Sequence, residues 1–115
     1  MDIRLKRAYD DPADNDGHRV LVDAMWPRGV SKETAQLDDW MKDVAPSDEL
    51  RKWFGHDPEK WDDFRKRYHG ELDDNDAVKG LIDRAREGRV TLVYAAKDED
   101  HNNAIALRDY LRKNA

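Results

Sequence analysis

The side chains best suited to binding or catalysis are concentrated in two segments of the sequence. The first is Asp23-Ala24-Met25-Trp26-Pro27-Arg28-Gly29. Arg28 can hold a carboxylate or phosphate through two hydrogen bonds, and Asp23 can bind a hydroxyl group, a metal or Arg28 itself. Trp26 can stack on a planar ligand, or it can belong to the core. We therefore predict ligand-binding roles for Asp23, Trp26, Arg28 and Gly29, with an internal Asp23–Arg28 ion pair as the alternative.

The second point is the segment from Tyr94 to Asn103. Lys97 follows an apolar strand, and His101-Asn102-Asn103 is expected in the first turn of a closing helix, where free N–H groups favour anions. The segment therefore predicts an anion site, to which we assign Tyr94, Lys97, Asp98, Asn102 and Asn103. Alternatively, the acids from Asp98 to Asp100 complement the helix dipole and the amides cap the helix.

Two histidines are candidate proton carriers, because unperturbed imidazole has a pKa of about 6.5. We predict His101 and His56 as the catalytic residues if the site is catalytic, with Lys97 and Arg28 holding developing negative charge. A metal site built from His56, Asp57, His101 and Asp23 matches no compact ligand motif, so no metal is predicted.

Three apolar segments predict strands that would position these residues. Ile3 and Leu5 alternate with basic residues, which is typical of an edge strand, and the turn-rich stretch 10–17 ends it. Residues 19–23 and 90–95 have continuous apolar centres, as strands buried on both faces do. Because ligands of parallel α/β sheets bind beyond the carboxyl ends of strands, both chemical segments should share one crevice.

Apolar residues at helical spacing predict the helices between and after these strands. Ser31 is expected to cap a short turn, and a short strand over residues 40–44 is the alternative to the first predicted helix. The predicted helices cover residues 37–44, 47–54 with a stop at Gly55, 57–72, 76–87 with a left-handed stop at Gly88, and a closing helix that starts near Asp98 or Asp100. The expected fold class is a small α/β sandwich with a three- or four-stranded, mainly parallel sheet flanked by helices.

Composition limits the function classes. The 115 residues suit one domain, 1–115, and their 26 acidic against 21 basic side chains give a charge of −5. That charge disfavours general nucleic-acid binding, and no apolar run is long enough to cross a membrane. The start of the chain lacks the apolar segment of a signal peptide, so we expect a cytoplasmic protein.

Several cofactor classes lack their usual sequence features. There is no cysteine for thiolate metal sites or nucleophilic catalysis. The glycine-rich loops for dinucleotides and nucleoside triphosphates are absent, as is the Gly-x-Ser-x-Gly elbow of hydrolases. The sequence identifies no cofactor and no oligomeric state.

Three separated motifs carry a resemblance over nearly the whole chain: Leu21-Val22-Asp23-x-x-Trp26-Pro27-Arg28-Gly29, Leu50-Arg51-Lys52-Trp53-Phe54-Gly55-His56-Asp57-Pro58 and Tyr94-Ala95-Ala96-Lys97-Asp98-x-x-His101-Asn102-Asn103. The chain resembles the YeaO-like proteins, the domain-of-unknown-function family 488. The resemblance implies that the three segments act together, but it carries no established activity. Ala24-Met25 departs from the Arg-Leu of the family pattern and removes a positive charge beside Asp23. A methyltransferase label used for some members is disfavoured because the chain has no glycine-rich loop for S-adenosylmethionine.

The leading hypothesis is a domain that binds a small anionic or nucleotide-like ligand, either without turnover or with histidine acid–base catalysis. The alternative is a non-enzymatic protein-interaction module in which Trp26, Trp53 and Trp61 are partly exposed and the acidic surface attracts a basic partner. A third hypothesis makes the Asp23–Arg28 and Asp98–Lys97 pairs purely structural. A methyltransferase-like or metal-dependent enzyme ranks below these.

Overall fold

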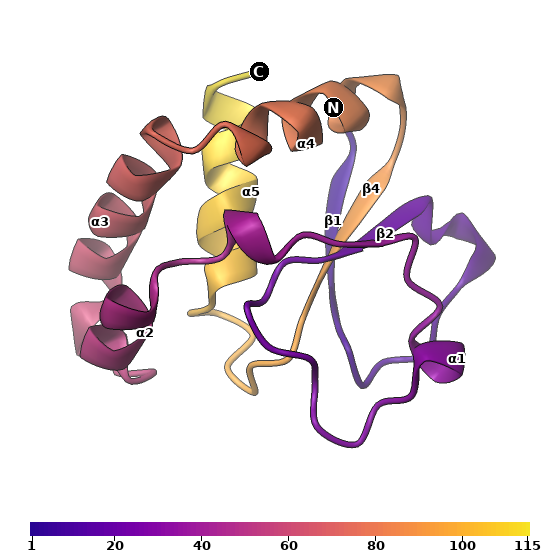
Figure 1. The fold of residues 1–115 in the computed structure, drawn as a ribbon, viewed down its shortest axis with the longest axis horizontal. Coiled ribbons are helices and arrows are strands. Elements are labelled where there is room, and N and C mark those ends of the chain that lie inside the picture. The colour runs from indigo at the N-terminus through magenta and orange to yellow at the C-terminus, as the bar shows by residue number, and fades with distance from the viewer.

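A computed structural model describes residues 1–115 and contains a four-stranded, fully parallel sheet in the order β1-β4-β2-β3. The strands are β1 (Ile3–Arg7), β2 (His18–Leu21), β3 (Asp39–Trp40) and β4 (Val90–Tyr94). This sheet, with helices packed against it, confirms the predicted α/β class (Figure 1). The strand expected at the edge, β1, is an edge strand, and the apolar β4 lies between β1 and β2 with every residue buried.

The five helices are α1 (Lys32–Ala35), α2 (Asp48–Phe54), α3 (Trp61–Asp73), α4 (Ala77–Glu87) and α5 (Asn103–Lys113). Three of them, α1, α2 and α5, begin at a side-chain cap. Ser47 Oγ accepts a hydrogen bond from the Leu50 N–H at the start of α2, and left-handed Gly55 ends it, as predicted. Asp57 caps the next segment, where a 3₁₀ turn at Pro58–Lys60 leads into α3.

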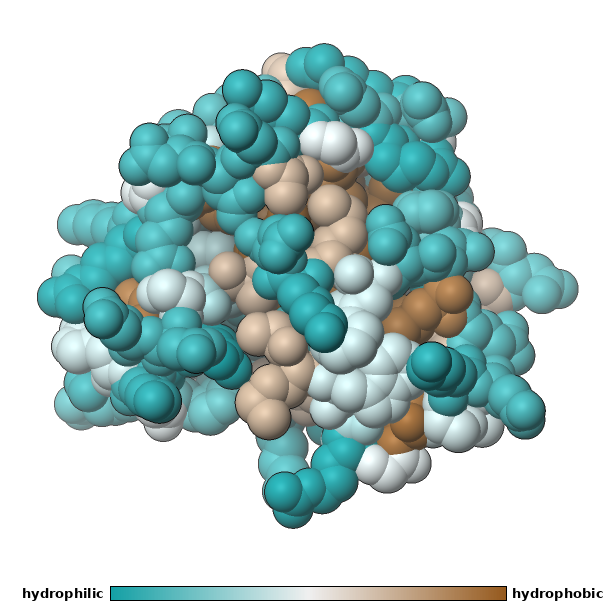
Figure 2. Space-filling model, in the orientation of Figure 1, coloured by the Kyte–Doolittle hydropathy of each residue, from teal (hydrophilic) through white to brown (hydrophobic).

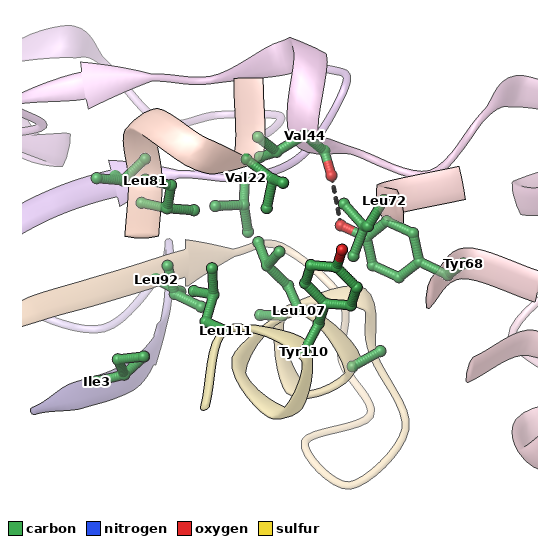
Figure 3. Packing of buried hydrophobic residues seen from close by; sticks show 14 of the residues in the cluster. Ile3, Val22, Val44, Tyr68, Leu72, Leu81, Leu92, Leu107, Tyr110 and Leu111 are labelled. Atoms are coloured by element: carbon green, nitrogen blue, oxygen red, sulfur yellow. Dashed lines mark hydrogen bonds between the residues drawn. The ribbon is translucent and has the colours of Figure 1, made fainter. Parts of the chain in front are cut away.

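The main core lies between one face of the sheet and the helices. Val20 and Val22 from the β2 segment and Leu92 from β4 pack there against Leu107 of α5. Figure 3 shows Tyr68 of α3 among these side chains, with its hydroxyl donating a hydrogen bond to the Val44 carbonyl. Burial raises the pKa of the Tyr68 hydroxyl well above its ordinary value, so this group stays a neutral donor.

The other face of the sheet is covered by connecting segments and is partly polar. Leu21 and Val93 pack under Trp26, Leu37 and Trp40. Toward the amino ends of the strands, the same face carries a buried ion pair in which Arg19 Nη1 lies 2.6 Å from Asp16 Oδ2. Lys6 Nζ also lies 3.1 Å from Asp16 Oδ1, so the carboxylate has two cationic partners.

Figure 2 shows how the excess of charged residues is accommodated. Hydrophilic side chains cover most of the face in view, and less polar side chains lie between them. The charged residues, 41% of the chain, therefore form a solvated surface around a conventional core.

The predicted helix over residues 37–44 is wrong. The chain instead forms β3, which pairs with β2 at Val20↔Asp39 and Leu21↔Trp40, followed by a 3₁₀ turn at Lys42–Val44. Only part of the alternative strand over residues 40–44 forms. The helical spacing predicts the wrong element because Leu37 and Trp40 pack on one face of the sheet and Val44 packs on the other. The three side chains therefore do not share one buried face, as they would on a helix.

The ends of three predicted helices also differ. The helix predicted over residues 57–72 begins only at Trp61, because residues Pro58–Lys60 form a 3₁₀ turn. The closing helix begins at Asn103 and not near Asp98 or Asp100, because the Asp98 carboxylate accepts hydrogen bonds from the Asp100 and His101 N–H groups and holds a turn. The helix before β4 ends at Gly88 in an extended conformation with φ 165°, so the predicted left-handed stop is wrong there.

Candidate functional site

The two chemical segments meet because β2 and β4 are parallel neighbours. Leu21 pairs with Val93, and the Val22 N–H continues the ladder to the Val93 carbonyl at 3.1 Å. Beyond these strand ends lies a cavity of about 880 Å³, within the size range of small-molecule sites. It is lined by residues 23–28, Pro46, Arg51, Lys52, Phe54, His56, Phe64, residues 95–98, Asn102 and Asn103.

Asp23 presents a half-buried carboxylate to this cavity. Its Oδ2 accepts a hydrogen bond of 2.9 Å from the Ala95 N–H, and its Oδ1 accepts one of 3.0 Å from Asn103 Nδ2. Burial raises the pKa of Asp23, although these two hydrogen bonds and the nearby positive charges of Arg51 and His56 oppose the shift. The carboxylate is thus held in position by the fold without full compensation for its desolvation.

Four lysine or arginine side chains line the cavity, against two aspartates, in a chain whose net charge is negative. The side chains of Arg28, Lys52 and Lys97 make no ion pair or hydrogen bond and are on exposed residues. Arg51 pairs with Asp48 through Nη2, but its buried Nε has no acceptor. The cavity therefore contains cationic groups that the protein itself does not neutralise.

Helix α2 brings Arg51 and Lys52 to this cavity. Glu71 of α3 fixes the start of α2 by accepting hydrogen bonds from the Ser47 N–H at 2.8 Å and from Ser47 Oγ at 2.6 Å. Phe54 then packs on Phe64 of α3, with ring centroids 4.2 Å apart. A polar contact at one end and a stacked aromatic pair at the other therefore hold α2 against α3.

His56 lines the cavity at the end of α2 in a left-handed conformation, with φ 57°. This backbone geometry is uncommon for residues other than glycine. It directly follows left-handed Gly55, so the chain makes a tight reversal that leaves His56 exposed at the cavity. Its imidazole is available to an incoming ligand, as the prediction of a site role requires.

His101 lies outside the residues that line the cavity. Its Nδ1 is 3.0 Å from Asp98 Oδ2, and its ring meets Trp61 edge to face at 5.4 Å. The hydrogen bond from the Asp100 N–H, followed by those from His101, lowers the pKa of Asp98. Asp98 does line the cavity, so His101 contacts the site through its carboxylate partner.

The structure brings most of the predicted ligand-binding residues together. Those that line the cavity are Asp23, Trp26, Arg28, Lys97, Asp98, Asn102 and Asn103, with His56 among the predicted catalytic residues. Gly29, Tyr94 and His101 do not line it. Asn102 also caps α5, since its Oδ1 accepts a hydrogen bond from the Ile105 N–H at 3.0 Å.

Sequence reasoning missed Arg51 and Lys52. Both belong to the motif that includes His56, and they lie one helical turn before it, so the motif itself was the available signal. Their positions on a short helix suggested only ordinary surface charge. Their role emerges only when α2 is placed against the ends of β2 and β4.

The proposed internal ion pairs do not form. Asp23 accepts hydrogen bonds from Ala95 and Asn103 and makes no ion pair with Arg28. Asp98 pairs with His101 and not with Lys97. The structure thus leaves Arg28 and Lys97 without the acidic partners that a purely structural network would give them.

The tryptophans are only half-buried, but each ring has a partner inside the protein. Trp26 meets Trp40 edge to face at 5.3 Å, and its Nε1 donates to the Val30 carbonyl. The Trp53 ring contacts Arg67 and Lys60, while Trp61 contacts Phe54 and Phe64. Trp26, Trp53 and Trp61 are thus partly exposed, as the protein-interaction hypothesis expects, although each ring also packs on a neighbour within the protein.

The structure contains no cluster of three or more His, Asp or Glu side chains that could hold a metal ion. None of its helices combines the length and the apolar character needed to cross a bilayer.

Comparison with known proteins places the chain in a family. A family profile described as "Inactive DUF488-N3 subclade" matches residues 2–115. The chain belongs to this DUF488-N3 subclade. This confirms the resemblance to YeaO-like proteins found in the sequence motifs.

Curated relatives of this DUF488-N3 chain are of similar length. It is 42% identical over 113 residues to the uncharacterized protein YeaO of Escherichia coli strain K12, which covers 97% of this chain and 98% of YeaO. It is 41% identical over 109 residues to the uncharacterized protein Rv3073c of Mycobacterium tuberculosis strain H37Rv, covering 95% and 92% of the two chains. No solved structure gives a significant match to the DUF488-N3 chain.

Proposed function

We propose that this DUF488-N3 protein binds a small anionic ligand in the cavity beyond β2 and β4. The observation that carries the proposal is the concentration of unpaired cations there: Arg28, Lys52 and Lys97 have no acidic partner although acids outnumber bases in the chain. A phosphate or carboxylate would supply the missing hydrogen-bond acceptors. Aromatic and proline side chains in the same cavity would cover the apolar part of such a ligand.

Binding without turnover fits the protein better than catalysis. The family description carries the word "inactive", and one of the two candidate proton carriers, His101, lies outside the cavity lining. In this proposal His56 contacts the ligand as a donor, and Asp98 and His101 hold the loop before α5. A cytoplasmic location and the absence of a nucleic-acid partner stay predictions.

Lys97→Ala tests the proposal most directly, because Lys97 is exposed at the cavity and bonds to nothing else in the protein. Isothermal titration calorimetry with inorganic phosphate, ribose 5-phosphate and nucleoside monophosphates would measure the affinity of each. We expect at least one of these phosphates to bind, and the variant to bind it about tenfold more weakly, since one charge-assisted hydrogen bond is lost.

The matched control is Lys113→Ala, which removes an exposed lysine at the far end of α5. It should leave phosphate affinity unchanged, and both variants should keep the wild-type melting temperature. The proposal fails if none of these phosphates binds, or if Lys97→Ala and Lys113→Ala weaken binding equally.

A further inference from the structure

The polar groups of Asp23 and Asn103 in the cavity lining accept hydrogen bonds but offer no free donor. Both N–H bonds of the Asn103 amide are used, one to Asp23 Oδ1 at 3.0 Å and one to the Val22 carbonyl at 3.2 Å. Its Oδ1 receives no hydrogen bond from the protein. Each Asp23 oxygen receives only one, although an ionised carboxylate can accept about four in total.

The remaining surfaces of the cavity differ in character from these acceptors. Trp26, Pro27 and Pro46 add flat, largely apolar side chains, while the exposed residues Arg28, Lys52 and Lys97 add positive charge. A complementary occupant therefore combines adjacent N–H donors, a planar body and a negative group. Asp23 is rigidly placed by backbone and amide contacts, so it can select donors by geometry as well as by charge.

We propose that the cavity recognises a guanine-type nucleoside monophosphate, with the adjacent ring N–H and exocyclic amine on the Asp23 and Asn103 acceptors and the phosphate among Arg28, Lys52 and Lys97. This inference rests on the anion site proposed above. Guanine is the base that presents two neighbouring donors on one edge. Adenine presents a donor next to a ring acceptor, which would face the acceptor atoms of Asp23 and Asn103 unfavourably.

Calorimetric titration with GMP, IMP, AMP and ribose 5-phosphate separates the parts of this proposal. IMP differs from GMP only by lacking the exocyclic amine, so GMP should bind about tenfold more tightly than IMP. AMP should bind no better than ribose 5-phosphate. Asp23→Asn should abolish the difference between GMP and IMP, whereas Asp63→Asn, on the exposed surface of α3, should preserve it.

The outcomes that overturn the inference are distinct from those that overturn the anion site. Equal binding of all four phosphates, or unchanged GMP preference in Asp23→Asn, overturns base recognition and leaves the anion site standing. Failure of all four to bind overturns base recognition, and failure of inorganic phosphate to bind as well overturns both. The wild-type ranking alone decides base recognition if Asp23→Asn does not fold. Tighter binding of a short guanine-containing single strand than of GMP would overturn the assignment to a free nucleotide.

Discussion

The burial that places Asp23 at the proposed binding site also makes its ionised carboxylate unfavourable for the stability of the folded protein. Its carboxylate is half-buried, makes no ion pair, and its pKa is raised by burial. Such a group destabilises the folded state when ionised, because folding removes it from water without a matching cation at contact distance. Binding sites commonly carry a stability cost of this kind, since a ligand provides the missing partner.

Asp23→Asn should therefore change the pH dependence of stability in a defined direction. The raised folded-state pKa means that native Asp23 holds its proton more tightly than the unfolded chain. Its contribution to stability is present below the unfolded pKa of about 3.9 and is lost as pH rises through the folded pKa. Relative to wild type, Asp23→Asn should gain stability between pH 4 and pH 7 in urea unfolding.

Asp63→Asn is the control for this comparison, because Asp63 is exposed and forms no hydrogen bond or ion pair. A stability difference between Asp23→Asn and wild type that stays constant from pH 4 to pH 7 would contradict the assignment.

At the scale of residues, the sequence indicates Asp23 as a site residue but not the hydrogen bonds of its carboxylate. Asp23 was identified by its position after a strand, whereas its hydrogen bonds depend on Ala95 and Asn103, more than seventy positions away.

At the scale of elements, Gly17 sets the close approach between the turn before β2 and the segment before β4. Its φ is 69°, and a side-chain carbon there would collide with the Arg89 carbonyl oxygen and lie 2.9 Å from Arg89 Cβ. The backbone on the other side is fixed, because the His18 N–H donates to the same Arg89 carbonyl at 3.0 Å. Only glycine suits this position.

Gly17→Ala should lower the free energy of unfolding by about 1–3 kcal/mol, because the strained backbone and the collision act together. Gly80→Ala is the matched control. Gly80 lies inside α4 with open space around it, so alanine there should stabilise by about 0.5–1 kcal/mol. Urea unfolding of both variants checks the opposite signs. Equal effects would show that the contact with Arg89 is not rigid.

Elements with strong local signals were predictable, and those decided by tertiary contacts were not. Helix α2 is predicted by its cap at Ser47 and α3 by the Asp57 cap of the 3₁₀ turn that leads into it, and both show regular apolar spacing. The segment over residues 37–44 carries similar spacing, but pairing of Asp39 and Trp40 with β2 overrides it. The same limitation hid the cavity-lining role of Arg51, which depends on the packing of α2 against α3.

For the whole molecule, the charge distribution predicts how binding should respond to salt. The cavity is rich in cations while the chain carries −5 overall, so attraction of an anion is local and competes with the surrounding negative field. The screening length is about 10 Å at 0.1 M salt and about 3 Å at 1 M. Affinity for a phosphate ligand should therefore fall several-fold between 50 mM and 500 mM NaCl in calorimetric titrations.

A ligand without a phosphate is the control for the effect of salt. Guanosine should bind with an affinity that changes little over the same salt range, because it presents no charge to Lys97 and its neighbours. A phosphate affinity that is independent of salt would contradict binding among these cations.

The central place of β4 has a consequence for how the protein is made. The β1 segment is the first strand to leave the ribosome, but it pairs only with β4. In the sheet, β4 also separates β2 from β1. Until Val90–Tyr94 has left the exit tunnel, only the short β2–β3 pairing can form, and Val20 and Leu21 lack the neighbouring strand on their other side. Assembly is therefore late in synthesis. A nascent chain stalled before β4 would be a substrate for chaperones and proteases.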